Sequence, residues 1–278
     1  MQELNKKLFG GYIKILVYTE HPDTEKILQK TYTEGLRLQK IFNFYDPESE
    51  LSQLNQNKKA KVSPELLSVI KTALNYCIQT QGAYDITLGK VIAKRKKGLI
   101  VKTHCSYKDV AIQENTVIFN NPEVQIDLGS IAKGFVVDCL IEYLQKNGIA
   151  ESLIDARGDI RVCGMINHVL GIQHPRQEGI VGSLKLNNQA VATSGDYEQF
   201  VGSFQNSHIV NQQELASVTV VAKTLQEADV FATALFVTPR SQREKLLKEN
   251  SQLQTLTVDV KEQVRTYNQF EKTLTYEN

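Results

Sequence analysis

An apolar segment that runs into a glycine turn and then into a helical pattern constrains this chain more than any other feature. Val124–Leu128 alternates apolar and polar residues as a half-buried strand does, and after the Gly129-Ser130 turn a helical pattern continues to Asp138. The first N–H groups of a helix have no partners within it and form its positive dipole end, to which Lys133 adds a charge. The segment therefore predicts a site in which Lys133 faces a phosphate, although glycines needed for packing and a solvated lysine would give the same pattern.

Composition predicts one enzyme-sized unit over residues 1–278, as one lobe or two closely packed lobes. With 41% hydrophobic and 23% charged residues, the 278-residue chain can bury a large core. The formal net charge of +1, spread over interspersed acids and bases, argues against nucleic-acid and membrane partners. The four cysteines lack the spacing of a zinc site, so we expect reduced thiols. The N-terminus has no signal-peptide or lipid-attachment pattern, which predicts a cytoplasmic location for the chain as given, unless an export signal was removed.

The spacing of apolar residues predicts an α+β fold with a largely antiparallel sheet. Ser63 and Pro64 form a strong helix start, because Ser caps a helix well and Pro fits its first position. Helices are predicted over 23–41, 64–80, from 131 onward, 225–237 and 241–249, and strands over 11–18, 152–155, 169–173, 182–186, 190–193, 217–221, 255–260 and 264–267.

Six further segments carry polar residues that packing alone would not require. They are Tyr45–Asn55, Gly82–Thr87, Ile154–Asp159, Val191–Tyr197, His208–Val210 and Glu227–Leu235. Together with the segment around Lys133, and in this order, they resemble the FAD:protein FMN transferase family, also called the ApbE-like family, over roughly Phe9 to Val237. The resemblance implies an ApbE-like (T-fold-like) architecture of the α+β class with several long helices.

The resemblance also implies a Mg²⁺-dependent enzyme that transfers the FMN moiety of FAD to a Thr or Ser hydroxyl of a target flavoprotein and releases AMP. Such phosphoryl transfer needs a hard cation on oxygen ligands. Asp229 and Thr233 are four residues apart on a predicted helix, so they lie on one face and can bind one ion. The alternative is an aspartate that complements the helix dipole and a threonine bonded to its own helix. The family implies the main-chain carbonyl of Ala132 as a third ligand.

The resemblance places further residues around FAD. Lys133 should contact the diphosphate or orient the site, in a catalytic role, and Asp159 should hold part of the nucleotide. Thr193, Ser194 and Gly195 match a Thr-Ser-Gly turn whose hydroxyl and amide groups can donate to the flavin nucleotide. Ordinary helix-surface and turn roles are the alternatives for these residues.

Two more residues are expected near the bound FAD. Tyr45 matches an aromatic residue that lies against the flavin ring, with a half-buried loop tyrosine as the alternative. Asp85 matches an acid of the family's Gly-aromatic-Asp-x-Thr segment, and we expect it to serve as a scaffold before any catalytic role.

His208 is the expected general acid or base, because imidazole titrates near neutrality and the family has a His in an equivalent His-Ile segment. The chain also departs from the family pattern. Asn211 begins the stretch where an Asp-Pro turn is usual, Phe9-Gly10-Gly11 replaces Met-Gly-Thr, and Arg157 replaces the first glycine of a Gly-Gly-Asp turn.

These departures leave two functions open: an active transferase, and a diverged FAD-binding protein or slow FAD pyrophosphatase without transferase activity. The retained Lys133, Asp159, His208, Asp229 and Thr233 favour the enzyme. A redox flavoprotein is less favoured, because the chain lacks a G-x-G-x-x-G fingerprint. The family implies FAD and an acceptor flavoprotein with a Thr/Ser flavinylation motif as partners, and the sequence does not name that flavoprotein.

Overall fold

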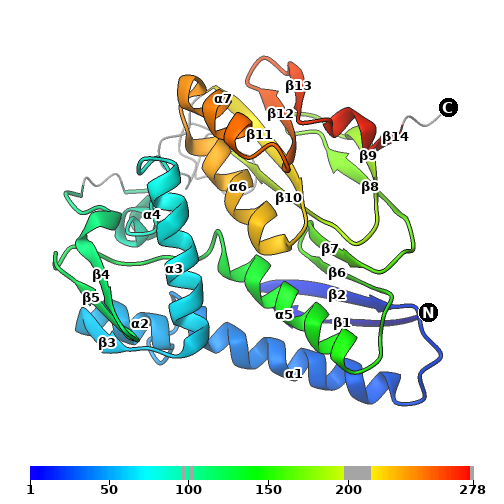
Figure 1. The fold of residues 1–278 in the computed structure, drawn as a ribbon, viewed down its shortest axis with the longest axis horizontal. Helices are drawn as coiled ribbons and strands as arrows, with labels where there is room; N and C mark the ends of the chain where they lie inside the picture. The colour runs from blue at the N-terminus through cyan, green and yellow to red at the C-terminus, as the bar shows by residue number, and fades with distance from the viewer. Residues whose placement is uncertain (96–97, 100–102, 197–213, 276–278) are drawn as a thin grey trace.

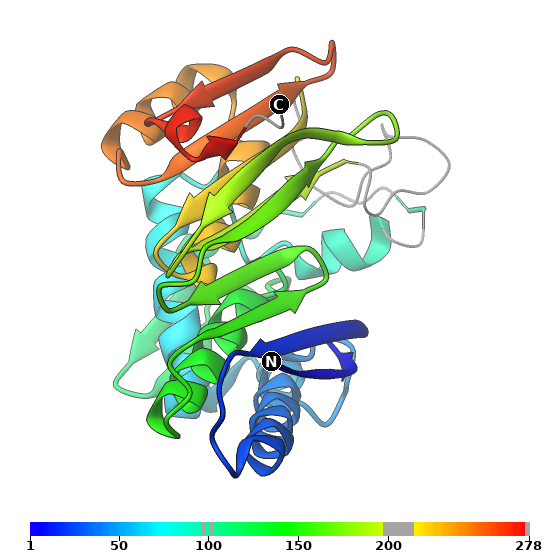
Figure 2. The ribbon, with the colours of Figure 1, turned by 90° about the vertical axis from the view of Figure 1, so that its right-hand side faces the viewer.

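The chain folds into α-helices and antiparallel strands in the computed structural model, which describes residues 1–95, 98–99, 103–196 and 214–275 (Figure 1). Within this part, the largest sheet has eight strands, and all neighbouring strands are antiparallel. In spatial order they are β1 (Gln2–Leu8), β2 (Gly11–Val17), β6 (Ser152–Ala156), β7 (Asp159–Cys163), β10 (Ala190–Gly195), β11 (Leu215–Ala222), β12 (Gln254–Asp259) and β13 (Val264–Tyr267). Figure 2 shows β1 and β13 at opposite edges of this sheet.

The two faces of the large sheet are covered by different layers. Three helices pack on one face and share its main apolar core: α1 (Thr24–Phe42), α5 (Ala132–Lys146) and α6 (Leu225–Val237) (Figure 1). A second apolar cluster joins the other face to a small sheet in the order β14 (Leu274–Thr275), β9 (Ile180–Leu186) and β8 (His168–Gln173). Every residue of β11 is buried, because this strand lies between both layers.

The remaining elements extend the helical layer. They are α2 (Glu50–Asn57), α3 (Pro64–Gln79), α4 (Gly89–Arg95), α7 (Arg240–Glu249) and a sheet in the order β3 (Lys59–Lys61), β5 (Thr116–Phe119) and β4 (Val110–Gln113). Short 3₁₀ turns lie at Tyr107–Asp109 and Phe270–Lys272. None of the helices in the described ranges has both the length and the apolar character that crossing a membrane requires.

The predicted fold class is confirmed. Among the predicted elements, helix ends marked by local sequence signals agree best with the structure. Ser63 caps α3 by accepting a hydrogen bond from Leu66 N at 3.2 Å, and α6 has the predicted bounds. Strand β1 was missed, because its sequence QELNKKL buries only Leu4 and Leu8 and so shows no period of two. That the chain forms a single module over residues 1–278 stays a prediction.

The prediction of a strand over Val124–Leu128 is wrong, although the alternating burial is present. In the described part of the chain, the segment makes only an isolated bridge, between Gln125 and Leu88. A side chain takes the place of a neighbouring strand: the Asn55 amide donates to the Ile126 carbonyl at 2.8 Å and accepts from its N–H at 2.7 Å. Alternating apolar and polar residues indicate which side chains are buried, but not which groups form hydrogen bonds with the backbone. The sequence therefore could not distinguish this extended segment from a strand.

Two hairpin turns lie side by side at the end of the sheet where α5 begins. Phe9-Gly10 joins β1 to β2, and Arg157-Gly158 joins β6 to β7. All four residues have positive φ, between 55° and 91°, as two-residue turns of type I′ require. Because β2 pairs with β6 in antiparallel register, the first turn is brought next to the second.

Candidate functional site

Segments far apart in the chain meet at one cavity of about 700 Å³. The end of α1, the start of α5, the middle of α6, the end of β10 and the two hairpin turns contribute to its wall. All the predicted site residues in the described part of the chain line it: Tyr45, Asp85, Ala132, Lys133, Asp159, Thr193, Ser194, Gly195, Asp229 and Thr233. A cavity of this size with converging polar groups suits a cofactor-sized ligand.

Helix α5 opens at this cavity, but several N–H groups at its start have partners inside the protein. Ala132 N donates to the carbonyl of Leu128 at 2.8 Å, and Gly134 N donates to Asp229 Oδ2 at 3.3 Å. The prediction that these helix amides are available to bind an anion is therefore corrected for both groups. The charged group that α5 presents to the cavity here is the side chain of Lys133.

Asp159 contacts both Lys133 and Thr193, although the three residues come from separate segments. Lys133 Nζ forms an ion pair with Asp159 Oδ2, and the other oxygen, Oδ1, accepts a hydrogen bond from Thr193 N at 3.2 Å. Asp159 is buried, whereas the Lys133 side chain is 24% exposed. The lysine therefore has a protein counter-ion and still reaches the cavity.

The predicted metal ligands lie on the α5 and α6 side of the cavity. Asp229 is buried in the second turn of α6, while Thr224 is the residue that caps this helix. Thr233 Oγ1 lies 3.1 Å from Ser194 Oγ, so its hydroxyl contacts β10. Ala132, whose carbonyl is the third predicted ligand, lines the same cavity. No group of three His, Cys, Asp or Glu side chains suited to a metal occurs among the described residues, and the predicted set needs only one carboxylate.

Asp85 is tied to its surroundings by three donors. Its Oδ1 accepts from Thr87 N at 2.8 Å and from Thr87 Oγ1 at 2.6 Å, and its Oδ2 accepts from Tyr107 N at 2.9 Å. Burial raises the pKa of this carboxyl, and the three donors oppose the rise. These bonds join Asp85 to Thr87 and Tyr107 at the cavity wall, and its scaffolding role stays a prediction.

Tyr45 lies at the rim of the cavity. It is 61% exposed, and its ring meets that of Phe44 edge to face with centroids 5.2 Å apart. Edge-to-face contact is a preferred arrangement of aromatic pairs, so Phe44 helps to orient the Tyr45 ring at the rim, and stacking of this ring on flavin stays a prediction.

Tyr84 and Asp127 are among the polar residues of the cavity wall to which no role was assigned from the sequence. Tyr84 is buried, its hydroxyl lies 3.0 Å from Ser130 Oγ, and burial raises its pKa well above the ordinary value. Asp127 accepts a hydrogen bond from Gly129 N at 2.8 Å. Both lie inside the segments that carry the family resemblance, so their positions, though not their contacts, could be found in the sequence.

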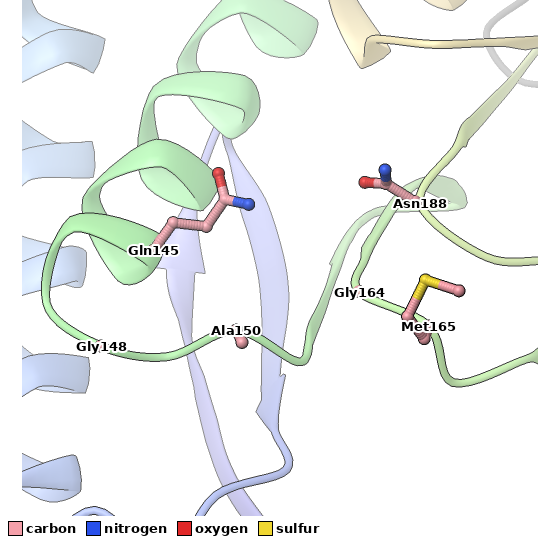
Figure 3. A pocket seen from close by; sticks show the side chains of 6 residues that line it. All are labelled: Gln145, Gly148, Ala150, Gly164, Met165 and Asn188. Atoms are coloured by element: carbon pink, nitrogen blue, oxygen red, sulfur yellow. The ribbon is translucent and has the colours of Figure 1, made fainter.

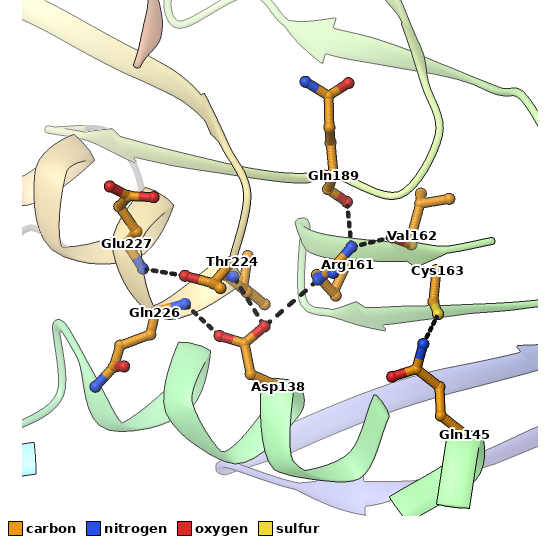
Figure 4. A network of polar contacts seen from close by, with 10 residues as sticks. Asp138, Gln145, Arg161, Val162, Cys163, Gln189, Thr224, Gln226 and Glu227 are labelled. Atoms are coloured by element: carbon orange, nitrogen blue, oxygen red, sulfur yellow. Dashed lines mark hydrogen bonds and ion pairs between the residues drawn. The ribbon is translucent and has the colours of Figure 1, made fainter. Parts of the chain in front are cut away.

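Asp138 fixes helix α6 against helix α5 (Figure 4). Its carboxylate accepts hydrogen bonds from Leu225 N at 2.9 Å and Gln226 N at 2.8 Å, the first N–H groups of α6, and lies 3.5 Å from Arg161 Nε. The helices touch here, because a Cβ on Gly134 would lie 2.5 Å from the Leu225 carbonyl oxygen. The packing role considered for Gly134 is therefore present, and Asp138 helps to position the helix that carries the predicted metal ligands.

Replacing Asp138 by Asn should destabilise the protein by about 1–2 kcal/mol, because the two carboxyl oxygens each accept one backbone bond and the NH2 group of an asparagine would face one of these N–H donors. Burial raises the pKa of Asp138, and its backbone donors oppose this. With a raised folded-state pKa, the contribution of this group is fully present below the unfolded pKa and is lost as pH rises through the folded pKa. Urea unfolding over a pH series should show a stability difference between wild type and variant that shrinks from acid towards neutral pH. A difference that grew with pH would contradict this.

His208 and Asn211 lie outside the described residues, so their roles stay predictions. The described residues on either side are informative. Gly195, at the end of β10, lines the cavity and pairs with Ser217 of β11. Asp196, the next residue, is buried and forms a bidentate ion pair with Arg176, with both N–O distances 2.7 Å. Gly195 therefore lies at the cavity wall, and Asp196 is the last described residue before residue 214.

A second, smaller cavity of about 280 Å³ shares no lining residue with the first (Figure 3). It lies beyond the C-terminal end of α5 and is lined by Gln145, Gly148, Ala150, Gly164, Met165 and Asn188. None of the predicted site residues contributes to it. The predicted site residues of the described part therefore line the larger cavity and not this one.

Known proteins share both the sequence pattern and the fold. The model of the ApbE family matches residues 9–257. An FAD:protein FMN transferase of Vibrio cholerae is 30% identical over 69% of this chain and 67% of its own length, and one of Haemophilus influenzae is 27% identical over 88% and 80%. The crystal structure of the ApbE protein of Thermotoga maritima has a TM-score of 0.88 over 99% of both chains, at 24% identity, and so shares the fold.

Proposed function

Because this chain belongs to the ApbE family, we propose that it transfers the FMN moiety of FAD to a Thr or Ser hydroxyl of an acceptor flavoprotein and releases AMP. The family and the enzyme class predicted from the sequence are confirmed by relatives that are transferases. The observation that carries the proposed reaction is the convergence on one cavity of the residues expected to bind FAD and the metal.

The proposed reaction is a phosphoryl transfer in which the protein positions groups and balances charge. The hydroxyl oxygen of the acceptor flavoprotein forms a bond to the phosphorus of the FMN half. The bond from this phosphorus to the bridging oxygen breaks, and AMP leaves with that oxygen. The hydroxyl proton passes to a general base, for which we propose His208. Lys133, held by Asp159, would bind the diphosphate from the start of α5.

The residues at the α6 side of the cavity fit a magnesium ion. Asp229 supplies a buried carboxylate, and Thr233 and Ala132 add a hydroxyl and a carbonyl oxygen in the same cavity wall, which is the hard oxygen set that Mg²⁺ prefers. These residues would hold the ion, which would neutralise charge on the diphosphate when bound.

Incubation with FAD, Mg²⁺ and an acceptor flavoprotein that carries an Asp-Gly-x-Thr/Ser-Gly-Ala segment tests the proposal. We expect a mass increase of one FMN on the flavoprotein and release of AMP in equal amount. An acceptor flavoprotein whose target Thr or Ser is replaced by Ala is the control. Release of AMP without modified flavoprotein would favour an FAD pyrophosphatase, and tight FAD binding without AMP would favour a diverged binding protein, the alternative that the altered Phe9-Gly10-Gly11 turn supports.

Lys133→Ala should weaken the binding of FAD about tenfold or more while riboflavin is little affected, because only FAD carries the diphosphate. Isothermal titration with both ligands measures this selectivity. Lys90→Ala is a matched control, because Lys90 is exposed and does not line the cavity. Lys133→Ala leaves the buried Asp159 carboxylate without its lysine partner. The double variant Lys133→Ala with Asp159→Asn should therefore be measured as well. If Lys133→Ala and the double variant each weakened the binding of FAD and of riboflavin equally, Lys133 would not contact the diphosphate.

A further inference from the structure

Arg157 occupies a backbone position that does not suit it. It has φ of +64° in a two-residue hairpin turn, where glycine or asparagine is favoured and a long side chain is strained. The neighbouring Gly158, with φ of +91°, meets the same requirement without strain. Residues kept in unfavourable backbone conformations are concentrated at functional sites. The side chain of Arg157, rather than its turn, is therefore the feature to explain.

The guanidinium of Arg157 is held at the cavity wall by the neighbouring hairpin turn. Its Nη1 donates to the Phe9 carbonyl at 3.1 Å, and Phe9, Gly10 and Arg157 all line the cavity. The side chain passes over Gly11: a Cβ on this glycine would lie 2.7 Å from Arg157 Cδ and 2.8 Å from Nε. Gly11 thus provides the space that Arg157 occupies, and the two positions form one structural unit.

An anionic ligand in this cavity would find its positive side chains at two places in the described wall. Four carboxylates line the described wall, whereas its basic side chains are Lys133 and Arg157. Lys133 pairs with Asp159, whereas the Arg157 guanidinium donates to the uncharged carbonyl of Phe9, and its five N–H donors are more than this bond uses. A guanidinium presents a planar fork of donors that matches phosphate oxygens.

We propose that Arg157 binds a phosphate group of FAD and that Gly11 is required to seat it. The inference rests on the proposed function, since FAD is the ligand. It joins two departures of this chain from its family pattern into a single feature: a side chain lost at position 11 makes room for the one gained at position 157.

A double-variant cycle tests this assignment. Arg157→Gly should weaken FAD binding about tenfold and leave riboflavin binding unchanged. The expected loss is at the low end for a charged hydrogen bond, because the Arg157 side chain is exposed. Gly11→Ala should weaken FAD to a similar extent by displacing the arginine, and should add nothing in the Arg157→Gly background. Arg157→Lys should retain part of the affinity. Thermal melting should show Arg157→Gly to be at least as stable as wild type, because glycine suits the turn.

The outcomes separate this inference from the proposed function. Unchanged FAD affinity in Arg157→Gly, or equal losses for FAD and riboflavin, would overturn the inference while leaving the transferase proposal intact. An effect confined to the KM for the acceptor flavoprotein would also overturn it, because Arg157 would then contact the protein substrate. A wild-type protein that binds no FAD would overturn both. Additive losses from Gly11→Ala and Arg157→Gly would reject the seating role of Gly11.

Discussion

Asp229→Asn is expected to eliminate Mg²⁺-dependent transfer while FAD still binds. Asp229 is the only carboxylate in the proposed ligand set, so Mg²⁺ affinity should fall by at least ~1.5–3 kcal/mol, the size of a charged contact. The asparagine oxygen can still accept the hydrogen bond that Gly134 N makes at 3.3 Å, so the α5–α6 contact should survive. The rate of AMP release as a function of Mg²⁺ concentration measures the effect.

Glu227→Gln is the matched control for Asp229→Asn. It removes the same charge from the same helix, but Glu227 does not line the cavity. We expect the Mg²⁺ dependence of this control to equal that of wild type. If Asp229→Asn also kept the wild-type dependence, Asp229 would not be a metal ligand.

His208→Asn should lower the rate of transfer by ~10²–10⁴-fold with little change in FAD affinity, the range for one positioned acid or base. Single-turnover transfer, with FAD affinity measured separately, gives the two quantities. His104→Asn is the control, because His104 is exposed and does not line the cavity. Transfer within a few-fold of wild type in His208→Asn would exclude His208 as the base.

The segment that follows His208 offers a second test of the same role. Asn211 and Gln212 stand where the family pattern has Asp and Pro, and a carboxylate near an imidazole orients it and stabilises its charged form. Asn211→Asp combined with Gln212→Pro should raise the rate if the divergence is a loss. A lower rate would indicate a segment refitted to a different acceptor flavoprotein.

Features that depend on neighbouring residues in the chain were determined by the sequence. Ser63 followed by Pro64 specified the start of α3, because a cap needs only the N–H groups of the next turn. The apolar pattern of Leu225–Val237 specified α6 and placed Asp229 and Thr233 on one side of it. The order of the polar segments identified the residues that line the cavity.

The tertiary structure decided which groups meet across the chain. Asn55 satisfies the backbone of Ile126, which turns an expected strand into an isolated extended segment. Asp229 accepts a hydrogen bond from Gly134 N, an amide of α5 that the sequence predicted to be available to an anion. Arg157 lies over Gly11, a contact between residues far apart in sequence. Local periodicity and capping act within a few residues, whereas these partners are chosen by how strands and helices pack, and no local pattern encodes that choice.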